Sequence, residues 1–325
     1  MRHVAAALLA LACCAWGLAA CLYTPVALPL RLALLAAALA GSALAFARTS
    51  VLRGWLAVAL AGLALGLVLR AVPEASSQRA WIAGQARAPT AEIAASGVTI
   101  HDVRNFRYQP SGALARAVWE TRTYDPAHLD SVWLGVSPFG GIPGVGHVFV
   151  SFGFDDGRYL AVSVEARKEQ REAYGPFPGM FRNYELVYVV GDERDVVALR
   201  TNVWKDAVYL YPLKATKDAM RAAFLDILER ANRLARAPEF YDTLTNSCSV
   251  NLARHANHVV PGRVPPSFKI LLAGFSDELA HELGLLDFEG SMEQARVRYR
   301  VNDRAQGDVD QGDFSARIRG LPSGA

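Results

Sequence analysis

The first seventy residues contain no aspartate or glutamate and only five basic residues, whereas all 31 acidic residues of the chain follow Arg70. Such a composition is typical of segments inside a bilayer, because charged side chains are costly in hydrocarbon. Three apolar runs, Val4 to Leu22, Leu28 to Ala47 and Val51 to Leu69, each fit the roughly 17 to 25 residues that a spanning helix needs. We therefore predict a membrane domain of about three transmembrane helices in residues 1–70.

A cleaved signal peptide is the alternative interpretation of the first apolar run. Ala19, Ala20 and Cys21 resemble a lipoprotein cleavage site. Two further apolar runs follow immediately, however, and this arrangement favours helices that stay uncleaved.

Basic residues at the ends of the runs indicate their orientation. Arg2 precedes the first run, and Arg48 and Arg53 lie between the second and the third. The positive-inside rule places these residues in the cytoplasm, so the chain after Arg70 is expected on the outer side. Because the Ala/Arg/Leu-rich composition suggests a bacterial protein, we expect a multi-pass protein of the bacterial inner membrane with its soluble domain in the periplasm.

The chain after Arg70 has the composition of a water-soluble domain. It contains 29 of the 34 basic residues and all acidic ones, so its net charge is near −2 and we expect no nucleic-acid partner. Pro, Ser, Gln and Ala predict a linker over 71–96, followed by one domain over 97–300. The tail, 301–325, is rich in Asp, Gly, Arg and Ser and is expected to be poorly ordered.

The soluble domain combines strand and helix patterns. Apolar and β-branched residues predict strands in five segments: Gly146 to Phe154, Arg158 to Ala166, Asn183 to Val190, Asp195 to Thr201, and Ala207 to Leu213. An apolar stripe predicts a helix from about Lys217 to Arg236, and a second helix should start near Cys248 after the N-cap residue types of 245–247. We predict an α+β fold with an antiparallel sheet.

Cys248 is the only cysteine after the membrane domain, so no internal disulfide can form in the soluble domain. In the first turn of a helix, free backbone amides and the helix dipole favour a thiolate and can also hold an oxyanion. We therefore interpret Cys248 as a candidate nucleophile. The alternative is a buried cysteine that only fills space.

His147 is the candidate base. It opens an apolar strand directly after the glycine-rich loop Phe139 to Gly146, where the backbone can approach a substrate closely. The alternative is a histidine at a strand end with an ordinary structural hydrogen bond.

The hairpin after His147 predicts a third candidate residue. Asp155-Asp156-Gly157 fits a three-residue loop with a left-handed glycine, and counting outward from that loop places His147 opposite Glu165. Glu165 could then orient the imidazole, although cross-strand His/Glu pairs are often only structural. A two-residue turn at Asp156-Gly157 would instead send Glu165 to the other face.

No metal site or cofactor is expected. His255 and His258 share a helix face, but no third ligand is apparent near them. The glycine-rich loop before His147 lacks the Lys and Ser/Thr of a phosphate-binding loop.

Four segments, in order, resemble a known family: GHVFVSFGFDDGRYLAVSVEARKE, GDERDVVALRT, VYLYPL and EFYDTLTNSCSVNLARHAN. Together they are similar to the Lnb N-terminal periplasmic domain, over roughly Val98 to Arg300. The resemblance implies a periplasmic thiol-enzyme domain like the permuted papain-like (NlpC/P60-like) folds, in which a strand histidine precedes a helix-start cysteine.

The family is associated with N-acylation of bacterial lipoproteins. The resemblance thus implies that Cys248 takes an acyl chain from a membrane lipid and passes it to an α-amine, with His147 as the base. Where relatives tend to carry Asn-Cys-Thr-Thr, this chain has Ser247 to Val250 in the order Ser-Cys-Ser-Val, and three helices precede the domain, so the substrate can differ.

We therefore expect a membrane-bound, thiol-dependent acyltransferase acting on lipoprotein or phospholipid substrates. A periplasmic cysteine peptidase or amidase would use the same nucleophile and base. A non-catalytic domain that binds envelope components is the other alternative.

Overall fold

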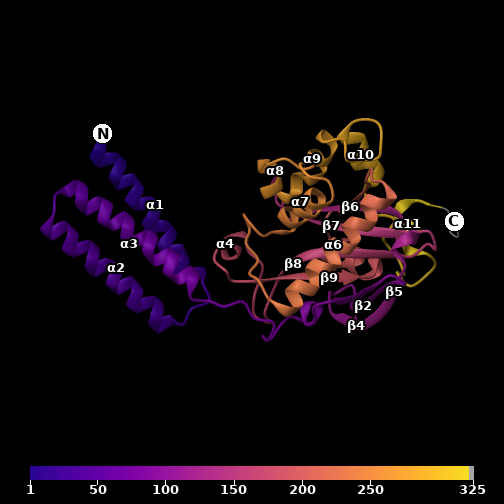
Figure 1. The fold of residues 1–325 in the computed structure, drawn as a ribbon, viewed down its shortest axis with the longest axis horizontal. Helices are drawn as coiled ribbons and strands as arrows, with labels where there is room; N and C mark the ends of the chain where they lie inside the picture. Colours follow the sequence, from indigo (N-terminus) through magenta and orange to yellow (C-terminus); the bar gives the residue numbers. More distant parts are fainter. Residues whose placement is uncertain (322–325) are drawn as a thin grey trace. The chain divides into compact units, whose positions relative to one another are not determined.

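The computed structural model describes residues 1–321 and divides the chain into two compact units (Figure 1). The first, here called the membrane unit, consists of 1–76, 173–185 and 239–243. The second, the sheet unit, consists of 77–172, 186–238 and the described residues from 244 onward. Two short loops from the later chain thus belong to the membrane unit.

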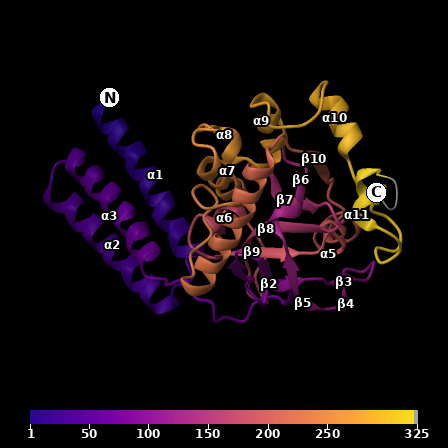
Figure 2. The ribbon, with the colours of Figure 1, turned by 45° about the vertical axis from the view of Figure 1, so that its right-hand side comes forward.

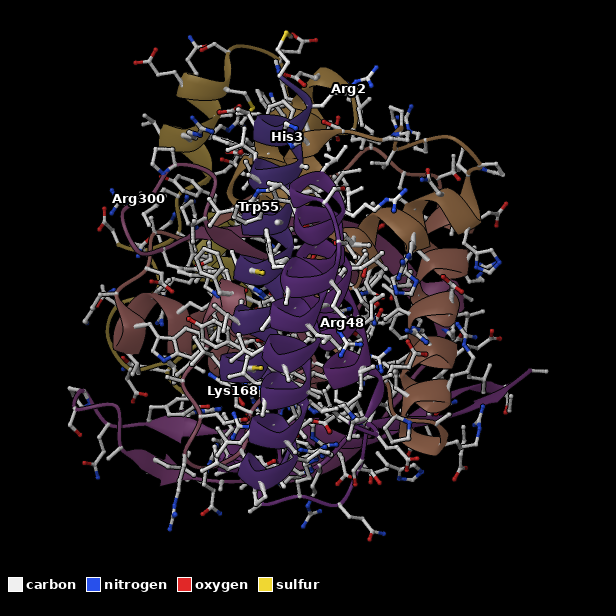
Figure 3. All side chains as sticks on the ribbon, turned by 90° about the vertical axis from the view of Figure 1, so that its left-hand side faces the viewer. Arg2, His3, Arg48, Trp55, Lys168 and Arg300 are labelled. Atoms are coloured by element: carbon white, nitrogen blue, oxygen red, sulfur yellow. The ribbon has the colours of Figure 1, made fainter. Side chains whose placement is uncertain are left out.

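The membrane unit contains three long apolar helices, as predicted: α1 (Arg2–Tyr23), α2 (Leu28–Arg48) and α3 (Val51–Ala71). Each is long and apolar enough to cross a bilayer. The start of α1 and the connection between α2 and α3 lie at the same end of the helix group in Figure 1. Figure 3 labels a residue on each of these helices: Arg2 on α1, Arg48 on α2 and Trp55 on α3.

Glycines allow α1 and α3 to approach closely. A Cβ atom on Gly17 would lie 2.5 Å from the carbonyl oxygen of Gly62, and one on Gly62 would lie 2.8 Å from the Cys13 backbone. Small residues that bring two backbones together are a common basis of helix association in membranes, where packing replaces the hydrophobic effect. The first apolar run therefore packs on the third as a helix.

The two loops of the membrane unit pack on the ends of these helices. Phe181 is buried with Ala20, Leu65 and Leu69, and its ring stacks on Tyr23 at 6.0 Å between centroids. In the other loop, Asp242 forms an ion pair of 3.0 Å with Arg70 at the end of α3. Both loops lie between segments of the sheet unit in the sequence. The chain therefore returns to the membrane unit twice after α3.

The sheet unit is built on an eight-stranded sheet in the order β1-β2-β9-β8-β7-β6-β10, with β5 paired to β2. The strands are β1 (Thr90–Ala94), β2 (Gly97–Arg104), β5 (Trp119–Tyr124), β6 (Leu129–Pro138), β7 (Gly146–Phe154), β8 (Tyr159–Arg167), β9 (Glu185–Gly191) and β10 (Tyr209–Pro212). A separate small sheet pairs β3 (Arg107–Tyr108) with β4 (Leu114–Arg116). The α+β class is as predicted, but the sheet is mixed rather than wholly antiparallel, because β2 pairs with β9 in parallel.

Helices and short helical turns complete the described chain. They are η1 (Ala83–Gln85), η2 (Pro126–His128), α4 (Pro176–Gly179), α5 (Glu193–Ala198), η3 (Leu199–Trp204), α6 (Lys217–Arg236), α7 (Cys248–Val259), α8 (Phe268–Leu271), η4 (Ala273–Phe275), α9 (Ser276–Glu282), α10 (Met292–Tyr299) and α11 (Phe314–Arg319). The strand predicted at Asp195 to Thr201 is wrong. Asp192 caps a helix there by accepting a hydrogen bond from the Arg194 amide, a local signal that the apolar composition concealed.

Helices cover both faces of the sheet (Figure 2). On β7, Val148, Val150 and Phe152 line the side that carries α6 and α7. Phe149 points to the other side, into a core shared with α5 and α11. This alternation follows from the period of two along a strand, and it gives β7 a nearly continuous apolar sequence.

Two predicted irregular segments contain ordered structure. The expected linker, 71–96, includes the edge strand β1, which pairs with β2 through a hairpin with Gly97 at φ 141°. The expected poorly ordered tail contributes Phe314 and Ile318, both fully buried, to the core beside α5. Polar composition misled the prediction here because a few apolar side chains suffice to dock a terminal segment; residues 322–325 of that tail lie outside the described residues.

The orientation of the membrane helices generates the first testable prediction. Because Arg2, Arg48 and Arg53, three of the five basic residues before Ala71, lie at the end of the helix group that holds the N-terminus, we expect the sheet unit on the periplasmic side. Alkaline phosphatase fused after Arg70 or at the C-terminus should be active in a bacterial host, since that enzyme matures only in an oxidising compartment. A fusion after Arg48 is the matched control and should be inactive; the reverse pattern would refute this topology.

Candidate functional site

Cys248 occupies the predicted position at the start of a helix. It is the first residue of α7, Ser247 is the N-cap, and the cysteine is only 5% exposed. The backbone amides of Val148, Ser249 and Cys248 itself lie near the sulfur and favour the thiolate. The thiol therefore lies against a group of amides that comes from the helix start and from β7.

The expected lowering of the Cys248 pKa is wrong. Burial disfavours the charged thiolate more than the three amides stabilise it, and the nearby Glu165 charge adds to the effect, so the pKa of Cys248 rises to about 11. A helix start lowers a cysteine pKa only where the thiolate retains some contact with water or a cation. In this structure the cysteine is a neutral thiol at neutral pH.

The three-residue hairpin loop between β7 and β8 is confirmed. The amide of Phe154 donates to the carbonyl of Arg158, and Gly157 adopts the left-handed φ of 81°. The ladder pairs Phe149 with Ser163, so the same register continued by two residues places His147 opposite Glu165. The alternative two-residue turn is excluded.

A serine hydroxyl lies between His147 and Glu165. Oγ of Ser163 is 2.6 Å from Nε2 of His147 and donates to Oε1 of Glu165, also at 2.6 Å. The direct distance from Nε2 to Oε1 is longer, 3.5 Å. Because the serine proton points to the carboxylate, the imidazole must donate its own Nε2 proton to Ser163, which leaves Nδ1 as the basic nitrogen.

Arg200 donates hydrogen bonds to Ser163 and Glu165. It is 2% exposed, and its Nη2 donates to Oε1 of Glu165 at 2.7 Å and to Oγ of Ser163 at 3.1 Å. The residue lies in η3, a π-helical extension of α5, and its Nη1 donates to the carbonyl of Val196. Single π-helical turns inside helices are frequent at functional sites, because the extra residue redirects a side chain.

Burial and charge set the protonation of the group. Burial lowers the pKa of His147 to about 4, with Arg200 adding to the effect and Glu165 opposing it. Burial alone would raise the pKa of Glu165, but the charges of His147 and Arg200 and the hydrogen bond from Ser163 lower it to about 2. At neutral pH, His147 is therefore neutral and Glu165 ionised.

Cys248 at the start of α7 lies near Val148, the residue that follows His147 in β7. The regular β7–β8 ladder ends at Phe149 and Ser163, and just beyond that point the backbone amide of Val148 lies near the Cys248 sulfur. The thiol thus lies beside the residue that follows His147, on a strand whose neighbour carries Glu165. Within the described part of the chain, no hydrogen bond joins Cys248 to His147, and none occupies Nδ1.

The end of the glycine-rich loop before His147 packs on η4. A Cβ atom on Gly146 would lie 2.8 Å from the Cα atom of Gly274 in η4, and the Gly274 amide donates to the carbonyl of Gly144. This contact fixes the start of β7, and with it His147. Gly140 and Gly141 of the same loop have open space where a Cβ atom would lie, and the expected approach of a substrate to this loop stays a prediction.

The two histidines of α7 anchor the helix that carries Cys248. Nδ1 of His255 and Nδ1 of His258 contact the two oxygens of Asp226 in α6 at 2.6 and 2.7 Å, and Nε2 of His255 contacts the Tyr188 hydroxyl of β9 at 2.7 Å. Among residues 1–321, no group of three His, Cys, Asp or Glu side chains could hold a metal ion. These contacts fix α7 against both α6 and the sheet.

Sequence reasoning missed Ser163 and Arg200. Ser163 is two residues before Glu165 and so shares its face of β8, a relation that the period of two along the strand could have revealed. Arg200 lay in a segment assigned to a strand, and only the fold brings it to Glu165, 35 residues away in the sequence.

Loss of Arg200 should destabilise the sheet unit. In Arg200→Met, Glu165 keeps a buried charge without its cation, which typically costs about 3 to 5 kcal/mol. Denaturant unfolding of the detergent-solubilised protein measures the change. Arg158→Met is the matched control, because Arg158 pairs with Asp156 at the surface. The free energy of unfolding of this variant should fall by less than about 1 kcal/mol. If the free energy of unfolding fell equally in both variants, the Arg200–Glu165 pair would contribute no more stability than a surface pair.

The raised pKa of Cys248 predicts the pH dependence of its alkylation. Because only the thiolate reacts, the rate with iodoacetamide should be low at pH 7 and should keep rising with pH through about 10. Mass spectrometry of the peptide that contains Cys248 gives the rate separately from the membrane cysteines. Free cysteine, whose rate levels off near its pKa of about 8.5, is the control. A rate that is already constant near pH 7 would mean a resting thiolate.

Comparison with known proteins assigns the larger part of the sheet unit. Residues 115–274 match the family model described as the Lnb N-terminal periplasmic domain. The matched segment includes Cys248, His147, Ser163, Glu165 and Arg200. Neither the curated proteins nor the solved structures gave a match. With three helices able to span a bilayer ahead of this segment, the chain is a membrane protein with a periplasmic domain, and that domain belongs to the Lnb N-terminal periplasmic domain family.

Proposed function

We propose that the protein is a thiol-dependent acyltransferase of the bacterial inner membrane, which moves an acyl chain from a phospholipid to the amine of a lipoprotein. The observation that carries the proposal is a buried thiol at a helix start near the amides of Val148 and Ser249, with His147, the residue before Val148, linked through Ser163 to Glu165. Nucleophile, base, orienting groups and oxyanion donors are the parts that acyl transfer by a cysteine requires. A domain that only binds a ligand needs none of them in this arrangement.

The first half-reaction forms a thioester on Cys248. Nδ1 of His147 takes the thiol proton while the sulfur attacks the carbonyl carbon of the lipid ester. The amides of Val148, Ser249 and Cys248, which lie near the sulfur, would hold the developing oxyanion. The ester C–O bond then breaks, and the leaving alcohol receives the proton from His147.

The second half-reaction transfers the acyl chain. The α-amine of the acceptor attacks the thioester carbonyl and loses a proton to Nδ1 of His147. The C–S bond breaks, an amide forms, and the proton on His147 returns to the sulfur. Atoms balance without water or a cofactor, and excluding water from the buried thioester favours the amine over hydrolysis.

The high pKa of the Cys248 thiol and the low pKa of the His147 imidazole make proton transfer from the thiol to the imidazole unfavourable in the resting site. A resting ion pair is disfavoured, so proton transfer has to accompany attack on a bound carbonyl. As His147 becomes positive, the charge of Glu165 stabilises it through Ser163, in the manner of the carboxylate in a catalytic triad. Arg200 keeps Glu165 ionised for this purpose.

Replacement of the two central residues tests the proposal. Cys248→Ser exchanges the thiol for a far weaker acid of similar shape, so acyl transfer should fall at least about a hundredfold. His147→Ala should cost a similar factor, and the double variant little more, because residues that act in one step are not additive. Mass spectrometry of the full-length protein in phospholipid nanodiscs, before and after addition of a lipoprotein peptide, measures the thioester and the amide product.

The control for this experiment is Ser249→Ala, which removes a hydroxyl next to Cys248 that donates to the Ile270 carbonyl but keeps the amide. It should retain a Cys248 thioester. Full activity of Cys248→Ser at an unchanged melting temperature would refute the enzyme and favour a binding domain. A thioester that water or a peptide releases, with no transfer to an amine, would favour a peptidase or amidase.

A further inference from the structure

An apolar pocket lies between the sheet and the helices of the sheet unit. It has a volume of about 460 Å³, within the range of small-molecule sites. Side chains of β6 and β7 form its floor, and those of α6, α7 and α9 form its walls. Several wall residues, among them Leu252, Val259, Leu279 and Leu283, are only partly buried, so aliphatic surface that a ligand could cover faces the pocket.

The lining selects for a hydrocarbon chain. It consists mainly of Leu, Val, Ile, Ala and Met side chains, with Phe152 as its single benzene ring, so it offers little for a planar ring to stack on. No carboxylate lines the pocket, and the only cations, Lys214 and Arg263, are exposed at its rim. A cationic ligand therefore has no partner there, whereas an aliphatic chain would bury apolar surface on every side.

The pocket begins beside the candidate site. Ser249 and Val148 line it, and they directly follow Cys248 and His147 in the sequence. From Ser249 it extends along α7 to Val260, a distance of roughly 16 Å at the rise of an α-helix. One leaflet of a bilayer has a hydrocarbon thickness of about 15 Å, so the pocket is about as long as one lipid acyl chain.

We propose that this pocket holds the acyl chain of the phospholipid donor, with the ester carbonyl at Cys248 and the terminal methyl group toward Val260. This assignment rests on the proposed function, because it needs Cys248 to react with a lipid ester. The pocket then acts as a ruler that sets the length of the transferred chain. It also shields the thioester from water while the acceptor amine arrives.

Photocrosslinking tests the occupant directly. The probe is a phosphatidylethanolamine whose 16-carbon chain ends in a diazirine, placed in nanodiscs with the full-length Cys248→Ser protein so that the probe stays intact. We expect crosslinks in the distal half of α7, near Val259 and Val260. Excess unlabelled phosphatidylethanolamine should compete for them. Crosslinks restricted to α1, α2 and α3 would overturn the proposal, as would labelling of α7 by the matching free fatty acid but not by the lipid.

Matched substitutions on α6 separate the pocket from the helix surface. Ala223 lines the pocket, whereas its neighbour Ala222 is exposed to solvent. In Ala223→Trp the indole should fill the space and reduce labelling of α7 at least about tenfold, while Ala222→Trp should label as the parent does. Equal labelling in the two variants would exclude the pocket. Ala223→Leu adds less bulk and serves if the tryptophan variant unfolds.

The Ala223→Leu variant with Cys248 intact tests the ruler. Mixed-chain phospholipids should give shorter thioesters on Cys248 than they give on the wild-type protein, because the pocket is shallower. An unchanged distribution of acyl-chain lengths on Cys248 would show that the pocket does not set the chain length. A general loss of folding would lower the amount of thioester but would not change this distribution. If α7 is labelled but Cys248 is never acylated, the proposed function fails and the pocket stands. If Cys248 is acylated without labelling of α7, the pocket assignment fails alone.

Discussion

The buried charge pair between Arg200 and Glu165 is the interaction on which the candidate site depends. A carboxylate this close to an imidazole inside the protein would otherwise take up a proton, and a neutral acid could not stabilise a charged His147. Arg200, nearly inaccessible to solvent, prevents that and also donates to Ser163. The serine proton is thereby directed to Glu165, and the imidazole is held in the tautomer whose Nδ1 is basic. One cation from a π-helical turn thus fixes the protonation of three groups.

The two faces of β7 contact different parts of the sheet unit. His147 and Phe149 project toward the side of α5 and α11, where Arg200 is anchored. Val148 and its alternate neighbours project toward α6 and α7, where the apolar pocket lies. Cys248 begins α7 on the second side, and the backbone amide of Val148 lies near its sulfur. The polar group of His147, Ser163 and Glu165 and the apolar pocket are thus separated by the strand that carries both His147 and Val148.

Local patterns predicted what short-range physics controls. The three apolar helices follow from the absence of acidic residues before Arg70, and α7 starts where the residue types of 245–247 predicted it, although Ser247 makes no side-chain capping hydrogen bond. The register that faces His147 toward Glu165 follows from the Asp-Asp-Gly loop. Predictions failed where composition concealed the deciding contact: Asp195 to Thr201 became helical under a local cap at Asp192, and the polar tail was held by a few apolar side chains such as Phe314.

The sequence by itself determined the membrane helices, the cysteine at a helix start and the register that places His147 opposite Glu165, because charge, residue types at helix starts and loop length act over a few residues. Only the tertiary structure decided the protonation of these groups and the pocket beside them. The Cys248 pKa depends on how deeply the thiol is buried, and burial outweighs the helix start that the sequence predicted. Arg200 meets Glu165 across 35 residues of chain, and the apolar pocket needs two strands and three helices at once. Such contacts are fixed by packing, which no local pattern encodes.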